Sequence, residues 1–338
     1  MKATIYDVAR EAGVSIAAVS QVINGKGKIS EERRAKITEV MEKLGYRPSV
    51  IAAALTGKKT YTLGLLVPDI SNPFFAEIAR AVEDRGDHHG YSLVICSTDN
   101  QDERVERYLT LLQQKSVDGI IIGTGIEDIK LLEPIRSKSI PVTMIARALP
   151  GESLQTVVVD DYEGGRLAAR HLLGLGHTAL AVLAEHPKVT SSQERIRGFR
   201  ETVAEAGLSL PDYFVKSSGR ELVKDGKRNA SELLRYAERP TAIFCCNDLL
   251  AIGALQAASE LGIHVPSELS VVGFDNTILA QVTVPALTTI AQPTERMGEL
   301  AVDLILQKNA GQPDEPPPLR TVLAPELIVR QTTAALLR

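Results

Sequence analysis

Residues 4–25 of this 338-residue chain read TIYDVAREAGVSIAAVSQVING, and this stretch predicts two short helices joined by a tight turn. Thr4 followed by Asp7 has the form of a capping box at the start of the first helix. Gly13 ends that helix, as expected where the chain turns through a left-handed conformation, and Ser15 caps the second helix. Two short helices joined by a short turn that contains glycine indicate a helix-turn-helix.

A third helix completes the predicted headpiece. Ser30 caps it, and the helix runs to Leu44 before Gly45 closes it. Its apolar residues recur at helical spacing and are expected to cover the open side of the helix pair: Ile37, Val40, Met41 and Leu44. A plain three-helix bundle that binds nothing is the alternative interpretation.

Charge is divided unevenly along the chain. Residues 1–60 hold 11 Lys or Arg and six Asp or Glu, so they carry +5, and the remaining 278 residues carry −9. A small basic head on a large acidic body indicates that the head binds a polyanion. If the head is a helix-turn-helix, its second helix enters the major groove with its N-terminal residues facing the bases.

Beyond residue 60, apolar runs alternate with helical patterns. The strand candidates are residues 62–68, 91–97, 119–123, 142–146, 156–160, 179–183, 242–246 and 270–274. The helical stretches between them are residues 73–85, 104–115, 162–175, 194–206, 231–236 and 249–261. This alternation is typical of parallel α/β sheets with right-handed crossovers, and eight or more strands favour two doubly wound lobes.

The composition argues against several other classes of protein. Hydrophobic residues make up 44% of the chain, which can therefore bury sizeable cores. No apolar run is long enough to span a membrane, and charged residues near the N-terminus argue against export, so we expect a cytoplasmic protein on the nucleoid. Neither the three cysteines (Cys96, Cys245 and Cys246) nor the six histidines have metal-ligand spacing. We therefore expect buried thiols, no metal and no cofactor.

Residues 4–49 and 50–59 also carry a family resemblance. The first segment resembles the DNA-binding headpiece of the lactose/galactose repressor (LacI/GalR) family, and the second, VIAAALTGKK, resembles that family's hinge helix. Segments such as VPDISNPFFAEI, DDYEGGRLAARHLLGLGH and PTAIFCCNDLLAIGAL follow in the family's order. The resemblance implies an all-α headpiece at residues 1–48, a hinge at 49–60 and an α/β periplasmic-binding-protein-like core at 61–338. Within the core it implies a first lobe of about 61–160 plus 292–320 and a second of about 161–290 plus 321–338.

The resemblance also implies which residues contact DNA. The residues expected to face bases are Ile16, Ala17 and Gln21. Those expected to contact phosphates are Thr4, Tyr6, Ser15, Ser20, Asn24, Lys28 and Ser30. In the hinge, Ala52 and Leu55 are implied to enter the minor groove, with Leu55 as the wedge. Family members commonly have Arg where Gln21 stands, and glutamine suits adenine where arginine suits guanine, so the operator is expected to differ there.

A ligand site is expected between the lobes, because parallel sheets bind ligands beyond the carboxyl ends of their strands. The polar candidates that follow strands or match family positions are Asn72, Thr124, Arg147, Asp160, Arg195, Glu221, Asn247 and Asp275. Phe74 or Phe75 would stack on a sugar or base. Each role has a structural alternative: Asn247 could cap a helix, Arg195 could pair with a carboxylate, and the phenylalanines could be core. Ala146 replaces an Asp that sugar-binding members often carry, which weakens the case for an ordinary hexose.

These observations predict a ligand-responsive transcriptional repressor that binds a pseudo-palindromic DNA operator as a homodimer, with a sugar-like effector between its lobes. One alternative is control by a protein partner, since the family's catabolite-control members work with a phosphocarrier protein. A transport-type binding protein is a further alternative, but it would not carry a helix-turn-helix. An enzyme is not favoured, because no nucleotide-binding glycine motif or nucleophile elbow is present.

Overall fold

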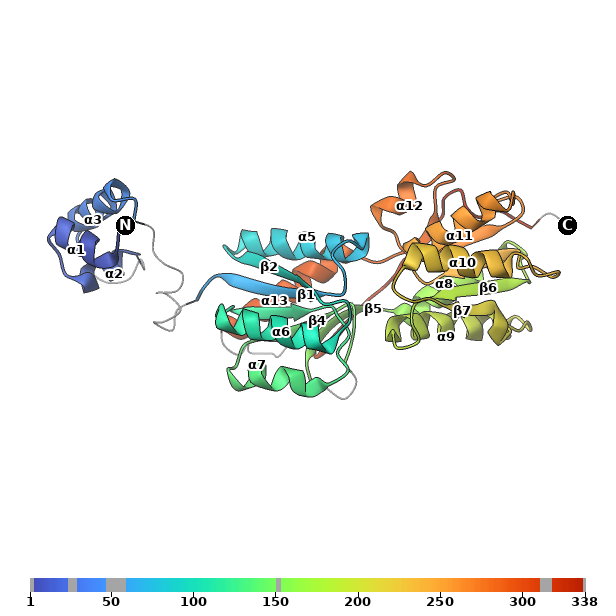
Figure 1. The fold of residues 1–338 in the computed structure, drawn as a ribbon, viewed down its shortest axis with the longest axis horizontal. Coiled ribbons are helices and arrows are strands. Elements are labelled where there is room, and N and C mark those ends of the chain that lie inside the picture. The colour runs from blue at the N-terminus through green and yellow to red at the C-terminus, as the bar shows by residue number, and fades with distance from the viewer. Residues whose placement is uncertain (1–2, 24–28, 47–58, 150–152, 311–317, 337–338) are drawn as a thin grey trace. The chain divides into compact units, whose positions relative to one another are not determined.

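The computed structural model describes residues 3–23, 29–46, 59–149, 153–310 and 318–336. The chain divides into two compact units, Met1–Thr60 and Tyr61–Arg338 (Figure 1). No helix among the described residues is both long enough and apolar enough to cross a membrane.

The first unit contains the three predicted helices: α1 (Ile5–Ala12), α2 (Ile16–Ile23) and α3 (Glu31–Lys43). The capping box is confirmed, since the Thr4 hydroxyl accepts from the Asp7 backbone N–H and the Asp7 carboxylate accepts from the Thr4 backbone N–H. Gly13 has the left-handed φ of 67° that closes α1. Val8, Val19 and Ile37 are fully buried, one from each helix, so this small bundle has a core of its own.

The second unit contains two six-stranded sheets, one in each lobe. The first sheet has the order β11-β5-β4-β3-β1-β2, and all of its strands are parallel. Its strands are β1 (Thr62–Val67), β2 (Ser92–Ser97), β3 (Gly119–Ile122), β4 (Val142–Ile145), β5 (Gln155–Val159) and β11 (Arg320–Leu323). The second sheet has the order β12-β10-β9-β8-β6-β7, in which only β12 runs antiparallel to its neighbour. Its strands are β6 (Leu180–Ala184), β7 (Val215–Ser217), β8 (Ala242–Cys245), β9 (Ser270–Asp275), β10 (Thr288–Ala291) and β12 (Glu326–Ile328).

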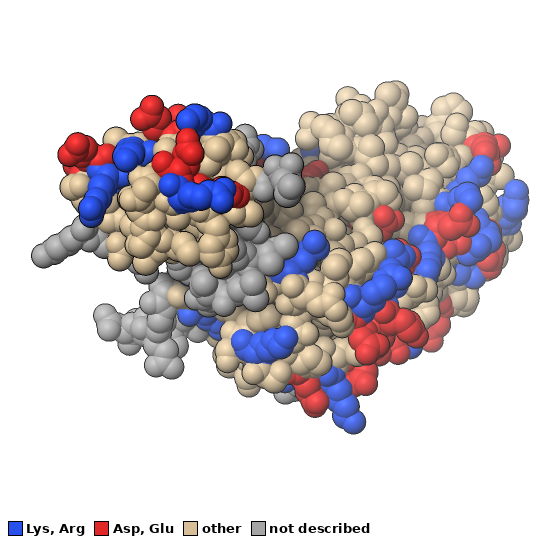
Figure 2. Space-filling view, turned by 60° about the vertical axis from the view of Figure 1, so that its left-hand side comes forward, with Lys and Arg blue, Asp and Glu red and all other residues tan. Residues whose placement is uncertain are grey.

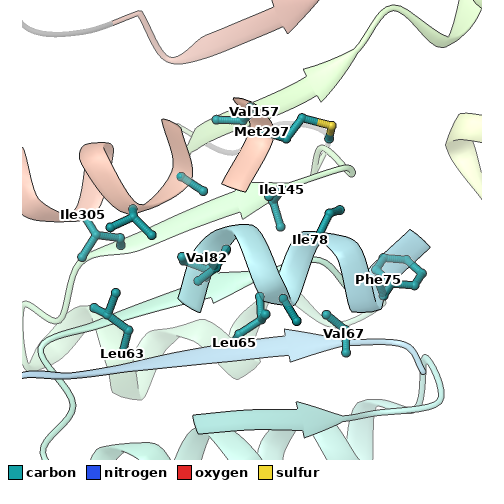
Figure 3. Close-up of a cluster of buried hydrophobic side chains, with 14 of the residues drawn as sticks. Leu63, Leu65, Val67, Phe75, Ile78, Val82, Ile145, Val157, Met297 and Ile305 are labelled. Atoms are coloured by element: carbon teal, nitrogen blue, oxygen red, sulfur yellow. The ribbon is translucent and has the colours of Figure 1, made fainter. Parts of the chain in front are cut away.

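Helices cover both faces of each sheet. In the first lobe, α5 and α13 pack on one face and α6, with the short η1 and α7, on the other. Their bounds are α5 (Pro73–His88), α6 (Asp102–Gln114), η1 (Ile129–Leu132), α7 (Glu133–Ser137) and α13 (Thr294–Ala310). Figure 3 shows Ile78 and Val82 of α5 above Leu65 of β1, with Met297 and Ile305 of α13 completing the cluster. This core fixes the position of β1 and therefore of the loop that follows it.

In the second lobe, α10 and α11 pack on one face of the sheet and α8 and α9 on the other. The bounds are α8 (Asp161–Gly174), α9 (Thr190–Glu205), η2 (Asp212–Phe214), α10 (Leu222–Leu233), α11 (Asp248–Glu260) and α12 (Ile278–Val282). The three cysteines are buried thiols, as the sequence indicated.

The eight predicted strands are all present, but the structure differs from the sequence analysis in several places. Helices α7, α12 and α13 were not among the expected helical stretches. The helix expected at residues 231–236 overlaps the end of α10, which runs from Leu222 to Leu233 and has no side-chain cap that would reveal its start. Four strands were not predicted, β7, β10, β11 and β12, and all have only three or four residues. The last crossing between lobes was expected near Arg320, yet β11 pairs with β5, so the chain leaves the first lobe after Leu323.

Charged side chains are interspersed on the face drawn in Figure 2. Basic and acidic residues lie beside one another along one flank, and a broad uncharged area adjoins them. The acidic excess of the second unit therefore does not form a large field of one sign on this face.

Candidate functional site

The predicted DNA-contacting residues of α1 and α2 lie on the surface of the first unit. Thr4, Tyr6, Ser15, Ile16, Ala17, Gln21 and Ser30 are exposed, and Ser20 is half-buried. Ile16 is 42% exposed at the start of α2, so its side chain is accessible to another molecule. Asn24, Lys28, Ala52 and Leu55 lie outside the described residues.

The N-cap hydroxyls of α2 and α3 keep a proton for a further partner. Ser15 Oγ accepts from the Ala18 N–H at 3.2 Å, and Ser30 Oγ accepts from the Arg33 N–H at 3.4 Å. Each hydroxyl can therefore still donate to a phosphate at a helix N-terminus, where the dipole attracts anions. The Thr4 hydroxyl differs, because it donates to the Asp7 carboxylate at 2.7 Å.

Two adjoining cavities lie between the lobes of the second unit. The outer cavity has a volume of about 680 Å³, within the range usual for small-molecule sites, and the inner recess has about 30 Å³. Both are lined by residues from each lobe, and four residues line the two together: Asn72, Phe75, Arg147 and Glu185. The ligand site expected at the ends of the strands therefore corresponds to a real space.

Arg195 of α9 is the most deeply buried cation of the inner recess. Its Nε donates to Asp161 Oδ1 at 2.8 Å and its Nη1 donates to the Cys246 carbonyl at 2.5 Å, while Asp275 Oδ1 lies 3.8 Å from Nη1. The guanidinium also stacks 3.6 Å from the centre of the Phe274 ring. Arg195 thus has the structural pairing that was the alternative interpretation, and it also lies in the wall of the recess.

Asp275 and Asn247 line the same recess. Asp275 ends β9 with a φ of 111°, its Oδ1 accepts from Gln292 Nε2 at 2.7 Å, and burial raises the pKa of its carboxyl well above the usual value. Asn247 caps α11 by accepting from the Leu250 N–H at 2.8 Å, while its buried Nδ2 has no hydrogen-bond partner among the described residues. Because an unmet buried donor is costly, this amide is suited to a ligand oxygen.

The aromatic and loop residues divide between the two cavities. Asn72 caps α5 by accepting from the Phe74 N–H, and it lines both spaces. Phe75 also lines both, whereas Phe74 reaches only the inner recess and packs edge-on against Phe75. Glu221 lies at the rim of the outer cavity and is paired with Lys224.

Two predicted site residues do not line either cavity. The Thr124 side chain is fully buried and bonds to Thr98 and Asn100, so it supports the loops rather than facing the space. Asp160 caps α8 by accepting from the Glu163 N–H at 2.9 Å. The polar groups of both side chains form hydrogen bonds with neighbouring residues and do not face a cavity.

Glu185 and Asp161 are the residues that sequence analysis left out of the site. Glu185 lines both cavities and accepts from the Ser192 hydroxyl at 2.9 Å. It directly follows β6, so the rule that selected the other strand ends would have found it. Asp161 does not line a cavity but positions Arg195, and burial raises the pKa of its carboxyl while Arg195 offsets part of that effect.

A helix-turn-helix unit followed by a two-lobed core with a cavity between the lobes is the architecture of a ligand-binding transcriptional regulator. Residues 4–49 match the model of the lacI family of bacterial regulatory proteins, and residues 169–333 match that of the periplasmic binding protein-like domain. The chain belongs to the LacI family of transcriptional regulators, and the resemblance seen in its sequence is confirmed.

Similar proteins extend over the full chain. The HTH-type transcriptional regulator DegA of Bacillus subtilis is 46% identical over 339 residues, which cover 99% of each chain. A structure of the lac repressor dimer bound to operator and the anti-inducer ONPF has a TM-score of 0.87 at 28% identity, covering 99% of this chain and 100% of that one. A LacI family regulator from Enterococcus faecium with bound ribose has a TM-score of 0.74 at 30% identity, covering 81% and 99%.

Proposed function

We propose that this regulator is a repressor that binds a pseudo-palindromic operator as a homodimer and is switched by a small molecule held between its lobes. The observation that carries the proposal is the inter-lobe cavity of about 680 Å³, whose inner end holds the Arg195, Asn247 and Asp275 side chains. A relative binds ribose and another was solved as a dimer on its operator, which supports both halves of the proposal.

A ligand can control DNA binding only if it prefers one arrangement of the lobes. The cavity walls come from both lobes, so a ligand that contacts Asn72 on one side and Asn247 on the other would bias their arrangement. In this proposal α2 reads the major groove, and Ala52 and Leu55 of the hinge enter the minor groove.

The DNA-binding half is tested by selecting binding sites from random DNA and titrating the selected site. We expect an inverted repeat, a dimer by light scattering, and an affinity that falls on the order of a thousandfold from 50 to 200 mM salt, since several phosphates are neutralised. The unit Tyr61–Arg338 alone should not bind the site. Salt-independent binding, or full affinity without residues 1–60, would contradict the proposal.

A further inference from the structure

We infer that the effector of this regulator is an anion, a sugar acid or a sugar phosphate, whose charged group is bound by Arg147. This inference rests on the proposed function and names the chemical class of its ligand. It follows from the way charges are paired around the two cavities.

Arg147 occupies the junction of the outer cavity and the inner recess, where it lines both. It comes just after β4, beyond Ala146, whose φ of 58° turns the chain at the end of the strand. A Cβ atom at Gly125 would lie only 3.2 Å from Arg147 Nη1, so the absence of a side chain there leaves room for the guanidinium. The position of Arg147 is therefore built into the cavity wall.

Arg147 has no partner among the described residues. No oxygen of the described chain accepts a hydrogen bond from it, and no carboxylate lies within 4 Å, in contrast to Arg195 with its two carboxylates. Removal from water lowers the pKa of the guanidinium, and the charge of Glu185 opposes that shift only in part. The five N–H donors of Arg147 thus have no acceptor among the described residues, and the side chain lines both cavities.

Most of the other charged groups of the cavity walls have partners within the protein, and three of the acidic residues are paired with a cation. The acidic residues already hold internal donors: Asp69 with Ser71, Asp99 with Arg104, Glu127 with Lys188, Glu221 with Lys224, and Asp275 with Gln292. Among the described residues, Glu185 bonds only to Ser192, and Arg220 bonds only to the carbonyl of Asp99. Ser71 is neutral, so Asp69 and Glu185 have no cationic partner among the described residues, and Arg147 and Arg220 have no carboxylate partner there. Of the two cations, only Arg147 lines both cavities.

An anionic group on the ligand would supply the partner that the Arg147 guanidinium lacks among the described residues. A carboxylate or phosphate matches the planar fork of Arg147 through two parallel hydrogen bonds. The unpartnered Nδ2 of Asn247 lines the recess nearby, and Glu185 can accept from ligand hydroxyls.

The test compares the full chain with Arg147→Gln and Arg147→Lys. The probes are glucose, galactose and ribose, each beside its acid or phosphate: glucuronate, galacturonate, glucose 6-phosphate and ribose 5-phosphate, with inorganic phosphate as the smallest anion. Arg239→Gln is the matched control, because it removes one arginine that pairs with Glu268 away from the cavity. Melting temperature and calorimetric Kd are measured for every pair.

We expect at least one anionic probe to bind the wild type, with its neutral parent more than tenfold weaker. Arg147→Gln should lose on the order of a hundredfold in affinity for that probe, and Arg147→Lys should recover part of it. Without any probe, Arg147→Gln should melt no lower than the wild type, because it removes an unpaired desolvated charge. Binding of the sugar acid but not the phosphate, or the reverse, selects between the two kinds of anion.

Several results would overturn the inference. These are equal affinity for a neutral sugar and its acid, unchanged anion binding in Arg147→Gln, no anion-dependent stabilisation at all, or a large loss of melting temperature in the unliganded variant. Operator titrations on the same proteins separate this result from the proposed function. If a neutral sugar releases the DNA, the anionic class of the effector is wrong but the proposed function stands. If the protein does not bind DNA, the proposed function is wrong, and the binding measurements still test the anion.

Discussion

Arg195 Nε and Asp161 Oδ1 lie 2.8 Å apart, although 34 residues separate them in the chain. Their side chains are only 6% and 13% exposed, so the ion pair is nearly withdrawn from water. Asp161 begins α8 and Arg195 lies within α9, and the bond holds the arginine at the wall of the inner recess. The positioning of Arg195 thus depends on how two helices pack.

Arg195→Ala is expected to abolish the response to the effector. The substitution removes a cavity cation and leaves Asp161 buried without its partner, which should cost about 3–5 kcal/mol of stability. Asp275→Ala tests the same recess without breaking that pair. If the effector is an inducer, both variants should bind operator normally and fail to release it. If it is a corepressor, both should stay weak on DNA, and an operator titration with and without effector distinguishes the two. A wild-type response in both variants would place the ligand elsewhere.

Gly165→Ala is expected to force α8 and α9 apart. A Cβ atom there would lie 2.0 Å from the Arg195 carbonyl oxygen, and Gly198 makes the reciprocal approach to the Tyr162 carbonyl. Overpacking of this kind costs about 1–3 kcal/mol, and it should also displace Arg195 from Asp161. Gly174→Ala on the same helix is the control, since nothing lies within 4 Å of its added methyl. Urea unfolding should show a lower midpoint for Gly165→Ala only, and equal midpoints would mean that the helices separate freely.

His177 is expected to make stability depend on pH. It is 3% exposed and its ring contacts Thr241, Ser270 and the Ala334 carbonyl, while burial lowers its pKa. As the pH falls through about 6.5, His177 therefore binds a proton in the unfolded chain before it does so in the folded chain. The free energy of unfolding that His177 contributes is present in full above that pH and is lost as the pH falls.

Melting temperatures between pH 7.5 and 5.5 measure this effect. The wild type should fall more steeply over that range than His177→Gln, which starts lower but lacks the titrating group. His89→Gln, an exposed histidine of the first lobe, should keep the wild-type slope. Parallel curves for the wild type and His177→Gln would show that His177 titrates alike in both states.

Gln21→Arg is expected to change one base preference in each half-site. Gln21 is exposed on α2, and the change from glutamine to arginine should shift preference from adenine toward guanine by about 1–3 kcal/mol. Ala35→Arg adds the same charge on the exposed side of α3 and should strengthen binding to all sequences without changing the preferred base. Binding-site selection reads both effects, and an unchanged consensus for Gln21→Arg would remove this residue from the base-reading set.

The three helices of the headpiece could be predicted from the sequence because the residues that begin and end each helix lie close together in the chain. The capping box of Thr4 and Asp7, the left-handed Gly13 and the Ser30 cap each act within four residues, so spacing alone identifies them. The strand candidates of the core were readable for a similar reason, since continuous apolar runs of parallel strands are distinctive. The short strands β7, β11 and β12 have no such run, because their residues alternate between half-buried and exposed or lie at a sheet edge.

Sequence by itself indicated the family, eight strands of the core and the edge of the sheets where ligand-facing residues are expected. Only the tertiary structure decided which of those residues face the cavity, because neighbours distant in sequence compete for each polar group. The Thr124 hydroxyl forms hydrogen bonds with Thr98 and Asn100, whereas Glu185 lies at the cavity wall. The charge state of the site was decided in the same way. Arg195 pairs with Asp161 across a helix crossing that two glycines permit, and Arg147 has no carboxylate partner among the described residues. No spacing along the chain reveals either fact.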